Sequence, residues 1–170
     1  GKGLAEAAVA LPLVLPPSVL GFYLLVTLGA NSPLGHWWQS AFGGPLVFSF
    51  EGLLVASVLV NLPFAIQPVQ RAFEGVAREL RDAAACAGMT PLRSLAAVEL
   101  PLAWPGVLTA AVLVFAHTLG EFGVVLMVGG AIPGETQTIA IAIYDRVQAF
   151  DLEAAGTMSA VLMTVSLLTI

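Results

Sequence analysis

The chain has 170 residues, of which 58% are hydrophobic and only 10% are charged, and its mean hydropathy is +0.94. Soluble domains usually carry about 25% charged residues, so this composition excludes an ordinary soluble domain and indicates an integral membrane protein. The formal net charge of −5 argues against a nucleic-acid partner.

The first predicted span runs from Ala7 to Leu28, in a stretch without Asp, Glu, Lys or Arg. About 20 apolar residues suffice for a helix to cross a bilayer. Three prolines lie within this span, Pro12, Pro16 and Pro17, and prolines free backbone carbonyls that must find partners in protein or water. We expect the span to lie against protein or a transport path, or to be a kinked structural helix.

The second predicted span covers Gly52–Val69 and contains a polar side chain, Asn61. Polar residues within a span usually face other helices. Asn61 therefore has two interpretations, a packing contact between helices or a contact with a polar solute on a translocation path.

A charged block follows the second span and contains four of the six basic residues of the chain, Arg71, Arg78, Arg81 and Arg93. Loops rich in Lys and Arg lie on the cytoplasmic side of a membrane. We therefore expect residues 71–100 to be cytoplasmic. Lys2 precedes two predicted spans, which places it on the same side.

The charged block begins with a predicted amphipathic helix. Its apolar residues recur at helical spacing, at Val69, Phe73, Val76, Leu80 and Ala84. The helix runs into a patch of small residues, so the backbone of another protein could approach closely there.

A sharp corner is predicted after that helix. Gly88 suits the left-handed position that ends a helix. Thr90 and Pro91 then form an N-cap and first turn, and Pro101 is expected to stop the second, short helix. The corner is either a docking element for another protein or an ordinary polar loop between spans.

The third predicted span covers Leu102–Val128 and holds an ionisable pair. His117 and Glu121 are four residues apart, on one helical face, with Thr118 beside them. An ionisable residue at membrane depth suggests a functional site. The alternative is that Glu121 pairs with His117 or a neighbouring helix and only holds the bundle together.

The C-terminal part is predicted to contain an outer loop over 129–138 and a short amphipathic helix over 139–150. The latter is too short to span a bilayer. A last span opens near Ala154. Because the chain starts at Gly1 and ends at Ile170 within an apolar run, we expect a fragment that lacks material at both ends.

The residues suggest neither an enzyme site nor a resident cofactor. His36 has no second ligand at metal-binding spacing, so no metal site is expected. A phosphate-binding Gly-rich loop with Lys and Ser or Thr is missing from the sequence, so ATP is not expected to bind here. Cys86 is the one cysteine, which rules out a disulfide within the chain.

The corner resembles the "EAA" signature of ABC importer permeases. The matching positions are Asp82, Ala83 and Ala84, then Gly88, Val98, Leu100 and Pro101. Asp82 stands where Glu is usual, and Val98 where Ile is common. In that family this segment is the cytoplasmic coupling helix, which inserts into a groove of the ATP-hydrolysing subunit. The resemblance implies that Asp82, Ala83, Ala84, Gly88, Met89, Pro91, Leu100 and Pro101 contact the ATPase.

Four further segments resemble molybdate transporter permeases: Leu11–Val26, Leu62–Val76, Thr118–Gly123 and Ile132–Asp145. The resemblance implies an all-α polytopic helix bundle with the type I importer permease (MetI-like) fold. It implies one permease domain over residues 1–170, with a coupling-helix segment over 72–100. The four spans expected here would be the last four of about six.

This resemblance implies a transport subunit, not an enzyme, that carries molybdate across a bacterial or archaeal inner membrane. Its expected partners are an ABC ATPase that binds ATP and Mg, a second permease copy, a periplasmic oxyanion-binding protein and the lipid bilayer. The possible translocation-path residues are Asn61, Thr118 and Glu121.

Three alternatives stay open. A sulfate, thiosulfate or tungstate permease would share the fold and the coupling segment. A secondary transporter driven by an ion gradient would need ionisable residues facing a cavity in several spans, and Glu121 is the one carboxylate deep in a predicted span. A purely structural membrane subunit would not need the capped corner at Gly88.

Overall fold

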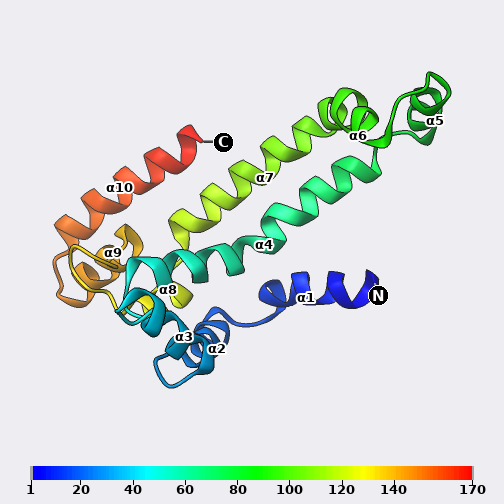
Figure 1. The fold of residues 1–170 in the computed structure, drawn as a ribbon. Coiled ribbons are helices and arrows are strands. Elements are labelled where there is room, and N and C mark those ends of the chain that lie inside the picture. The colour runs from blue at the N-terminus through cyan, green and yellow to red at the C-terminus, as the bar shows by residue number, and fades with distance from the viewer. Residues whose placement is uncertain (1, 170) are drawn as a thin grey trace. The chain divides into compact units, whose positions relative to one another are not determined.

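The computed structural model describes residues 2–169, apart from the side chains of residues 2, 5, 6 and 8 (Figure 1). These residues form helices and turns and include no strand, which confirms the all-α prediction. The helices are α1 (Lys2–Val14), α2 (Pro17–Leu28), α3 (Pro33–Phe42), α4 (Phe50–Glu74), α5 (Arg78–Cys86), α6 (Pro91–Ser94), the π-helix η1 (Leu95–Glu99), α7 (Leu100–Gly120), α8 (Gly123–Gly129), α9 (Ile139–Gln148) and α10 (Leu152–Leu168).

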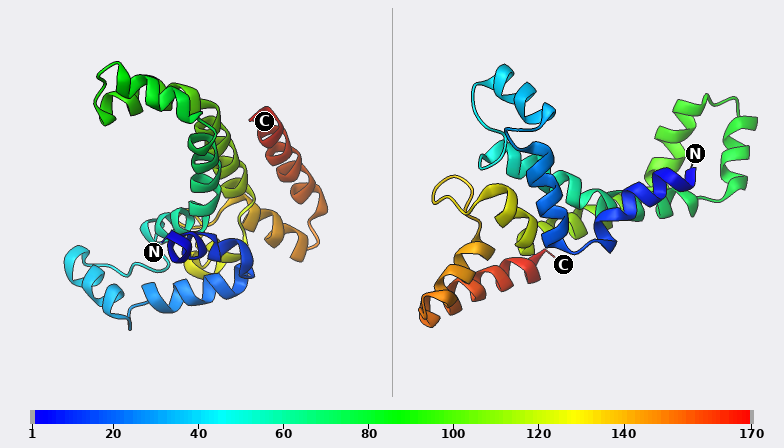
Figure 2. Two further views of the ribbon diagram at one scale, coloured as in Figure 1. Left: turned by 90° about the vertical axis from the view of Figure 1, so that its right-hand side faces the viewer. Right: turned by 90° about the horizontal axis from the view of Figure 1, so that it is seen from below.

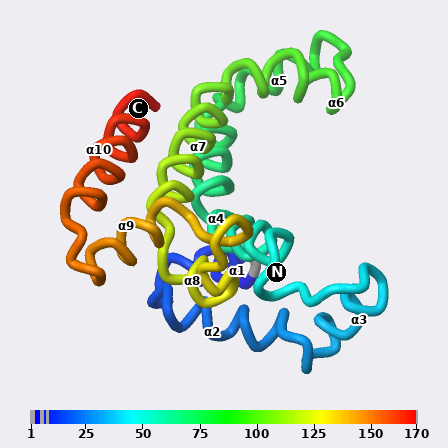
Figure 3. Tube along the Cα trace, turned by 90° about the vertical axis from the view of Figure 1, so that its left-hand side faces the viewer, coloured from blue at the N-terminus to red at the C-terminus, as the bar shows by residue number. Residues whose placement is uncertain are grey.

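Two compact units divide the chain. The first unit contains Gly1–Asn61 and Ala116–Ile170, and the second contains Leu62–Phe115. In the first unit α8 packs against α2 and α9 against α10 (Figure 3). Its core is formed by seven buried apolar residues: Leu28, Leu46, Val47, Ala56, Val60, Val124 and Val128.

Two helices are long and apolar enough to cross a membrane. They are Phe50–Glu74, with 25 residues, and the continuous helix Pro91–Gly120, with 30 residues. A third candidate is the pair Pro17–Leu28 and Pro33–Phe42, which is bent by 58°. The apolar helix α10, Leu152–Leu168, is shorter. The predicted span Gly52–Val69 thus lies within a longer helix.

The first predicted span, Ala7–Leu28, is not one helix. It is interrupted between α1 and α2, where Pro16 has the extended backbone angles φ −56° and ψ 138°. A residue that precedes proline is disfavoured in the helical region, and Pro17 follows directly. The two consecutive prolines therefore break the helix, whereas Pro12 is accommodated within α1.

The prediction of one continuous amphipathic helix from Val69 to Ala84 is also wrong. α4 ends at Glu74, and α5 begins at Arg78 after an extended residue, Ala77, with ψ 136°. The break follows Gly75, a residue that costs more entropy to hold in a helix than any other. The apolar periodicity continues across the break, which is why it did not reveal the interruption.

Pro101 does not stop a helix, contrary to the prediction. η1 carries α6 directly into α7, and the Leu100 N–H bonds to the Leu95 carbonyl oxygen across the wider π-turn. Proline cannot supply the amide hydrogen that a regular α-helix needs at its position. The π-turn shifts the hydrogen-bond register just before Pro101, so that the chain continues through it.

The third predicted span, Leu102–Val128, is broken near its end. α7 ends at Gly120 and α8 begins at Gly123, with Phe122 in a non-helical conformation at φ −124°. Glycines flank the break on both sides, and glycine is a poor helix former. The predicted short helix after the outer loop is confirmed as α9.

In the second unit, Gly106 of α7 lies against α4. A Cβ atom at this position would collide with the Cβ of Ala72 and would come 3.0 Å from the Pro68 carbonyl oxygen. Small residues at helix contacts allow close backbone approach within membranes. Gly106 therefore sets the separation of the two helices at this point. Figure 2 shows α5 and α6 forming the corner that connects them.

We predict that Gly106→Ala destabilises the protein by about 1–3 kcal/mol, the usual cost of overpacking a well-packed contact. The measurement is thermal unfolding in detergent. Gly156→Ala is the matched control, because Gly156 is also helical and a Cβ there would have nothing within 4 Å. Equal unfolding temperatures for both variants would contradict the close-contact interpretation.

Candidate functional site

The corner between α5 and α6 closes with a complete hydrogen-bond motif. Gly88 has φ +75°, in the left-handed region. The Met89 N–H donates to the Ala84 carbonyl oxygen at 3.0 Å, and the Gly88 N–H donates to that of Ala85, also at 3.0 Å. This pair of bonds is the Schellman motif, which satisfies carbonyls left over at a helix end. The predicted left-handed position of Gly88 is confirmed.

The start of the second helix also follows the prediction. The Thr90 hydroxyl accepts from the Arg93 N–H at 3.4 Å, and Pro91 occupies the first turn. These are the usual N-cap and first-turn roles of such residues. The chain therefore reverses within a few residues between α5 and α6.

Most predicted coupling residues lie at the surface of the chain. Asp82, Ala83, Gly88, Pro91, Leu100 and Pro101 are exposed, Met89 is half-buried and Ala84 is buried. A Cβ on Gly88 would have nothing within 4 Å. The corner thus presents an open, small-residue surface, while Ala84 packs inside the chain.

The three predicted translocation-path residues come together in the first unit. Asn61 is buried, and its Nδ2 donates to the Ser57 carbonyl oxygen at 2.8 Å and to Thr118 Oγ1 at 3.0 Å. Its Oδ1 lies 3.1 Å from His117 Nδ1. Because a carboxamide oxygen can only accept, His117 Nδ1 carries the hydrogen.

Glu121 completes this cluster from the break between α7 and α8. The residue is only 7% exposed, and its Oε2 lies 3.7 Å from His117 Nε2. Its Oε1 accepts from the Val124 N–H at 3.1 Å, which satisfies a free amide at the start of α8. The cluster thus joins α4, α7 and α8 through the side chains of Asn61, Thr118, His117 and Glu121.

These contacts bear on the two interpretations of the cluster. Both amide hydrogens of Asn61 already have acceptors, so Asn61 has no further N–H donor for a solute. Glu121 pairs with His117, which is the arrangement expected of a residue that holds a bundle together. The chemistry favours a polar splint at the helix break over direct binding of an anion.

A contact that the sequence analysis missed lies in the second unit. Arg81 Nε donates to Glu99 Oε2 at 3.0 Å, and Arg81 Nη2 donates to the Phe73 carbonyl oxygen. Arg81 and Glu99 are 18 residues apart, so they are not neighbours at i,i+3 or i,i+4 on one helix. Only their opposite charges within one polar block could have indicated this pairing.

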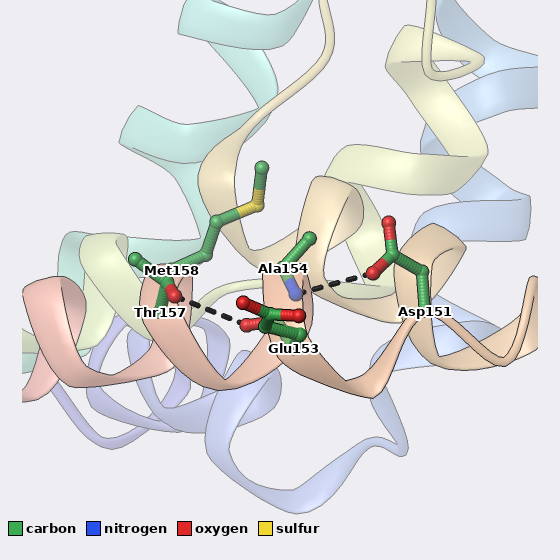
Figure 4. A pocket seen from close by; sticks show the side chains of 5 residues that line it. All are labelled: Asp151, Glu153, Ala154, Thr157 and Met158. Atoms are coloured by element: carbon green, nitrogen blue, oxygen red, sulfur yellow. Dashed lines mark hydrogen bonds between the residues drawn. The ribbon is translucent and has the colours of Figure 1, made fainter.

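The described residues form no cluster of metal ligands, and the pocket at the start of α10 is acidic. Residues 2–169 include no group of three or more His, Cys, Asp or Glu side chains that could hold a metal. A pocket of about 360 Å³ lies at the start of α10 and is lined by Asp151, Glu153, Ala154, Thr157 and Met158 (Figure 4). Two carboxylates at its edge would repel an oxyanion.

We predict that Asn61→Leu destabilises the protein by about 1–3 kcal/mol, because it removes the hydrogen bonds of partly buried groups on α4 and α7. Thermal unfolding of the purified protein measures this loss. Thr109→Val is the control, since the exposed Thr109 hydroxyl bonds only within its own helix, to Pro105. A stability loss no larger than that of the control would argue against the splint.

The chain matches a family described as "Binding-protein-dependent transport system inner membrane component" over residues 2–170. It is 52% identical to the molybdenum transport system permease protein ModB of Azotobacter vinelandii, over 91% of this chain and 68% of that protein. Its identity to ModB of Haemophilus influenzae is 39%, over 87% of this chain and 65% of that protein. The sulfate transport system permease protein CysT of Escherichia coli is 32% identical over 99% of this chain and 60% of its own length. The chain thus spans about two thirds of the curated relatives it matches.

Proposed function

Because the chain belongs to the binding-protein-dependent transport system inner membrane components, we propose that it is the permease part of an ATP-driven molybdate importer. The observation that carries this proposal is the 52% identity, over 91% of the chain, to a molybdenum transport permease. The 32% identity to a sulfate permease supports sulfate less well. Tetrahedral oxyanions of like charge differ mainly in size, so tungstate and sulfate are the cargoes to compare.

In this proposal the corner from Asp82 to Pro91 docks on a cytoplasmic ATPase subunit. The support is its open surface, with exposed small side chains around Gly88 and a turn closed by its own hydrogen bonds. A surface of this kind lets another backbone approach closely without reorganising the permease. Residues 71–100 would then be cytoplasmic, in agreement with their four arginines.

The proposed transport cycle is alternating access. Two permease copies form the path, a binding protein delivers the oxyanion, and the two ATPases bind ATP and Mg. The permease needs two packings of similar energy, and ATP binding must favour one of them. The motion of the ATPase subunits is transmitted through the corner to the spans, which rock as rigid bodies.

The deciding experiment is uptake into proteoliposomes that contain the full-length permease and its candidate ATPase, with the binding protein outside and ATP–Mg inside. Molybdenum taken up is measured by elemental analysis, with tungstate and sulfate as competing cargoes. We expect molybdate uptake that requires ATP. Uptake driven by an ion gradient without ATP would indicate a secondary transporter, and ATP-dependent uptake of sulfate alone would replace the cargo.

We predict that Gly88→Trp lowers the ATPase retained on the purified permease by about tenfold, because a bulky side chain in a packed contact costs about 1–3 kcal/mol. Co-purification in detergent measures this. Gly88→Ala is the matched control, since it introduces the same Cβ at φ +75° without the bulk. Full ATPase retention by Gly88→Trp would show that the corner is not part of the docking surface.

A further inference from the structure

Arg81 fastens the corner helix α5 to two other elements of the second unit. Its Nε donates to Glu99 Oε2 at 3.0 Å, and its Nη2 donates to the Phe73 carbonyl oxygen. The side chains of Arg81 and Glu99 are 39% and 18% exposed. We call Arg81, Glu99 and the Phe73 carbonyl the clasp.

The two ends of the clasp lie where helices are interrupted. Phe73 is in the last turn of α4, where carbonyl oxygens lack partners within the helix. Glu99 is the last residue of η1, directly before α7 begins. A guanidinium presents several donors in a rigid planar fork, so one side chain can hold both acceptors at once.

Non-α-helical segments lie on both sides of the corner, and the clasp bridges them. η1 interrupts the α-helical ladder over Leu95–Glu99, and such turns in long helices often lie at functional sites. On the α4 side of the corner, the helix is interrupted at residues 75–77, between α4 and α5. The corner is therefore joined to both long helices through non-α-helical segments, and the clasp is a polar side-chain link across them.

We propose that Arg81 and Glu99 are positioning residues that hold the corner in a fixed orientation on the long helices, so that movement of the docked ATPase reaches the transport path. This inference rests on the proposed function. It predicts that a permease without the clasp still binds the ATPase but transports less molybdate per ATP hydrolysed. The reason is that the corner then turns without moving the long helices.

The clasp is less exposed than the other arginine–carboxylate pairs of the described residues. Arg146 Nη1 lies 3.2 Å from Asp151 Oδ2, but the side chains are 52% and 40% exposed. Exposed pairs of this kind contribute little. Arg146→Met is therefore a matched control that removes an arginine–carboxylate pair outside the corner.

The test compares the full-length importer with the variants Arg81→Met, Glu99→Gln and Arg146→Met in proteoliposomes. Three quantities are measured: ATPase retained on the permease, ATP hydrolysed, and molybdate transported per ATP. We expect both clasp variants to retain the ATPase and to transport about threefold to thirtyfold less molybdate per ATP, the range typical of residues that modulate coupling. Arg146→Met should match the unmodified importer.

Two features separate this outcome from simpler explanations. Arg81→Met removes a positive charge and Glu99→Gln a negative one, so a shared defect cannot come from charge repulsion at the ATPase. The double variant with Arg81→Glu and Glu99→Arg should transport at least about threefold more per ATP than Arg81→Glu alone, because paired residues are not additive.

The outcomes that overturn the clasp are also defined. Unchanged molybdate per ATP in both variants would show that the pair does not position the corner. Loss of ATPase binding in both would assign the pair to docking or folding instead. If the unmodified importer itself fails to transport molybdate with ATP, the proposed function fails, independently of the clasp.

Discussion

Backbone hydrogen bonding at interrupted helices is the constraint on which this structure depends. Water is scarce inside a membrane span, so a helix break at that depth must find its hydrogen-bond partners within the chain. Glu121 supplies one for the Val124 amide at the start of α8. The breaks in the charged block are also bridged within the chain: Arg81 donates to the Phe73 carbonyl oxygen at the end of α4, and the Met89 N–H donates to the Ala84 carbonyl oxygen.

The same constraint gives a structural reason for the polar residues Asn61 and Glu121 within the predicted spans. Asn61 and Glu121 have the residue types expected on a path for a polar solute, yet Asn61 bonds to Thr118 and His117 of α7. Glu121 faces His117 and the amide at the start of α8. Both carboxyl oxygens of Glu121 lie next to protein groups, Oε1 at the Val124 N–H and Oε2 3.7 Å from His117 Nε2. These contacts join the two sides of the break between α7 and α8 and connect them to α4.

The sequence predicted the corner well because its signals are local. Gly88, Thr90 and Pro91 each act on neighbouring backbone groups, and the structure places all three in the expected roles. The prediction that Pro101 stops a helix was wrong, because the helix continues through Pro101 by means of a π-turn, and no residue pattern indicates such a turn. The pairings of Arg81 with Glu99 and of Asn61 with His117 join residues far apart in the chain, so periodicity carries no information about them. Docking at the corner stays a prediction, because it involves a second protein.

The length of the helix Pro91–Gly120, which includes the π-turn η1, limits how it can move in a bilayer. Its 30 residues correspond to about 45 Å at 1.5 Å per residue, whereas the hydrocarbon core is about 30 Å thick. The helix therefore exceeds the core by about ten residues, and in the proposed orientation these are the first ten, which include Arg93 and Glu99. Sliding the helix inward along its axis would draw these charges into lipid, at about 2.5–3.5 kcal/mol each. A helix anchored in this way responds to a pull at its end by tilting rather than by piston motion.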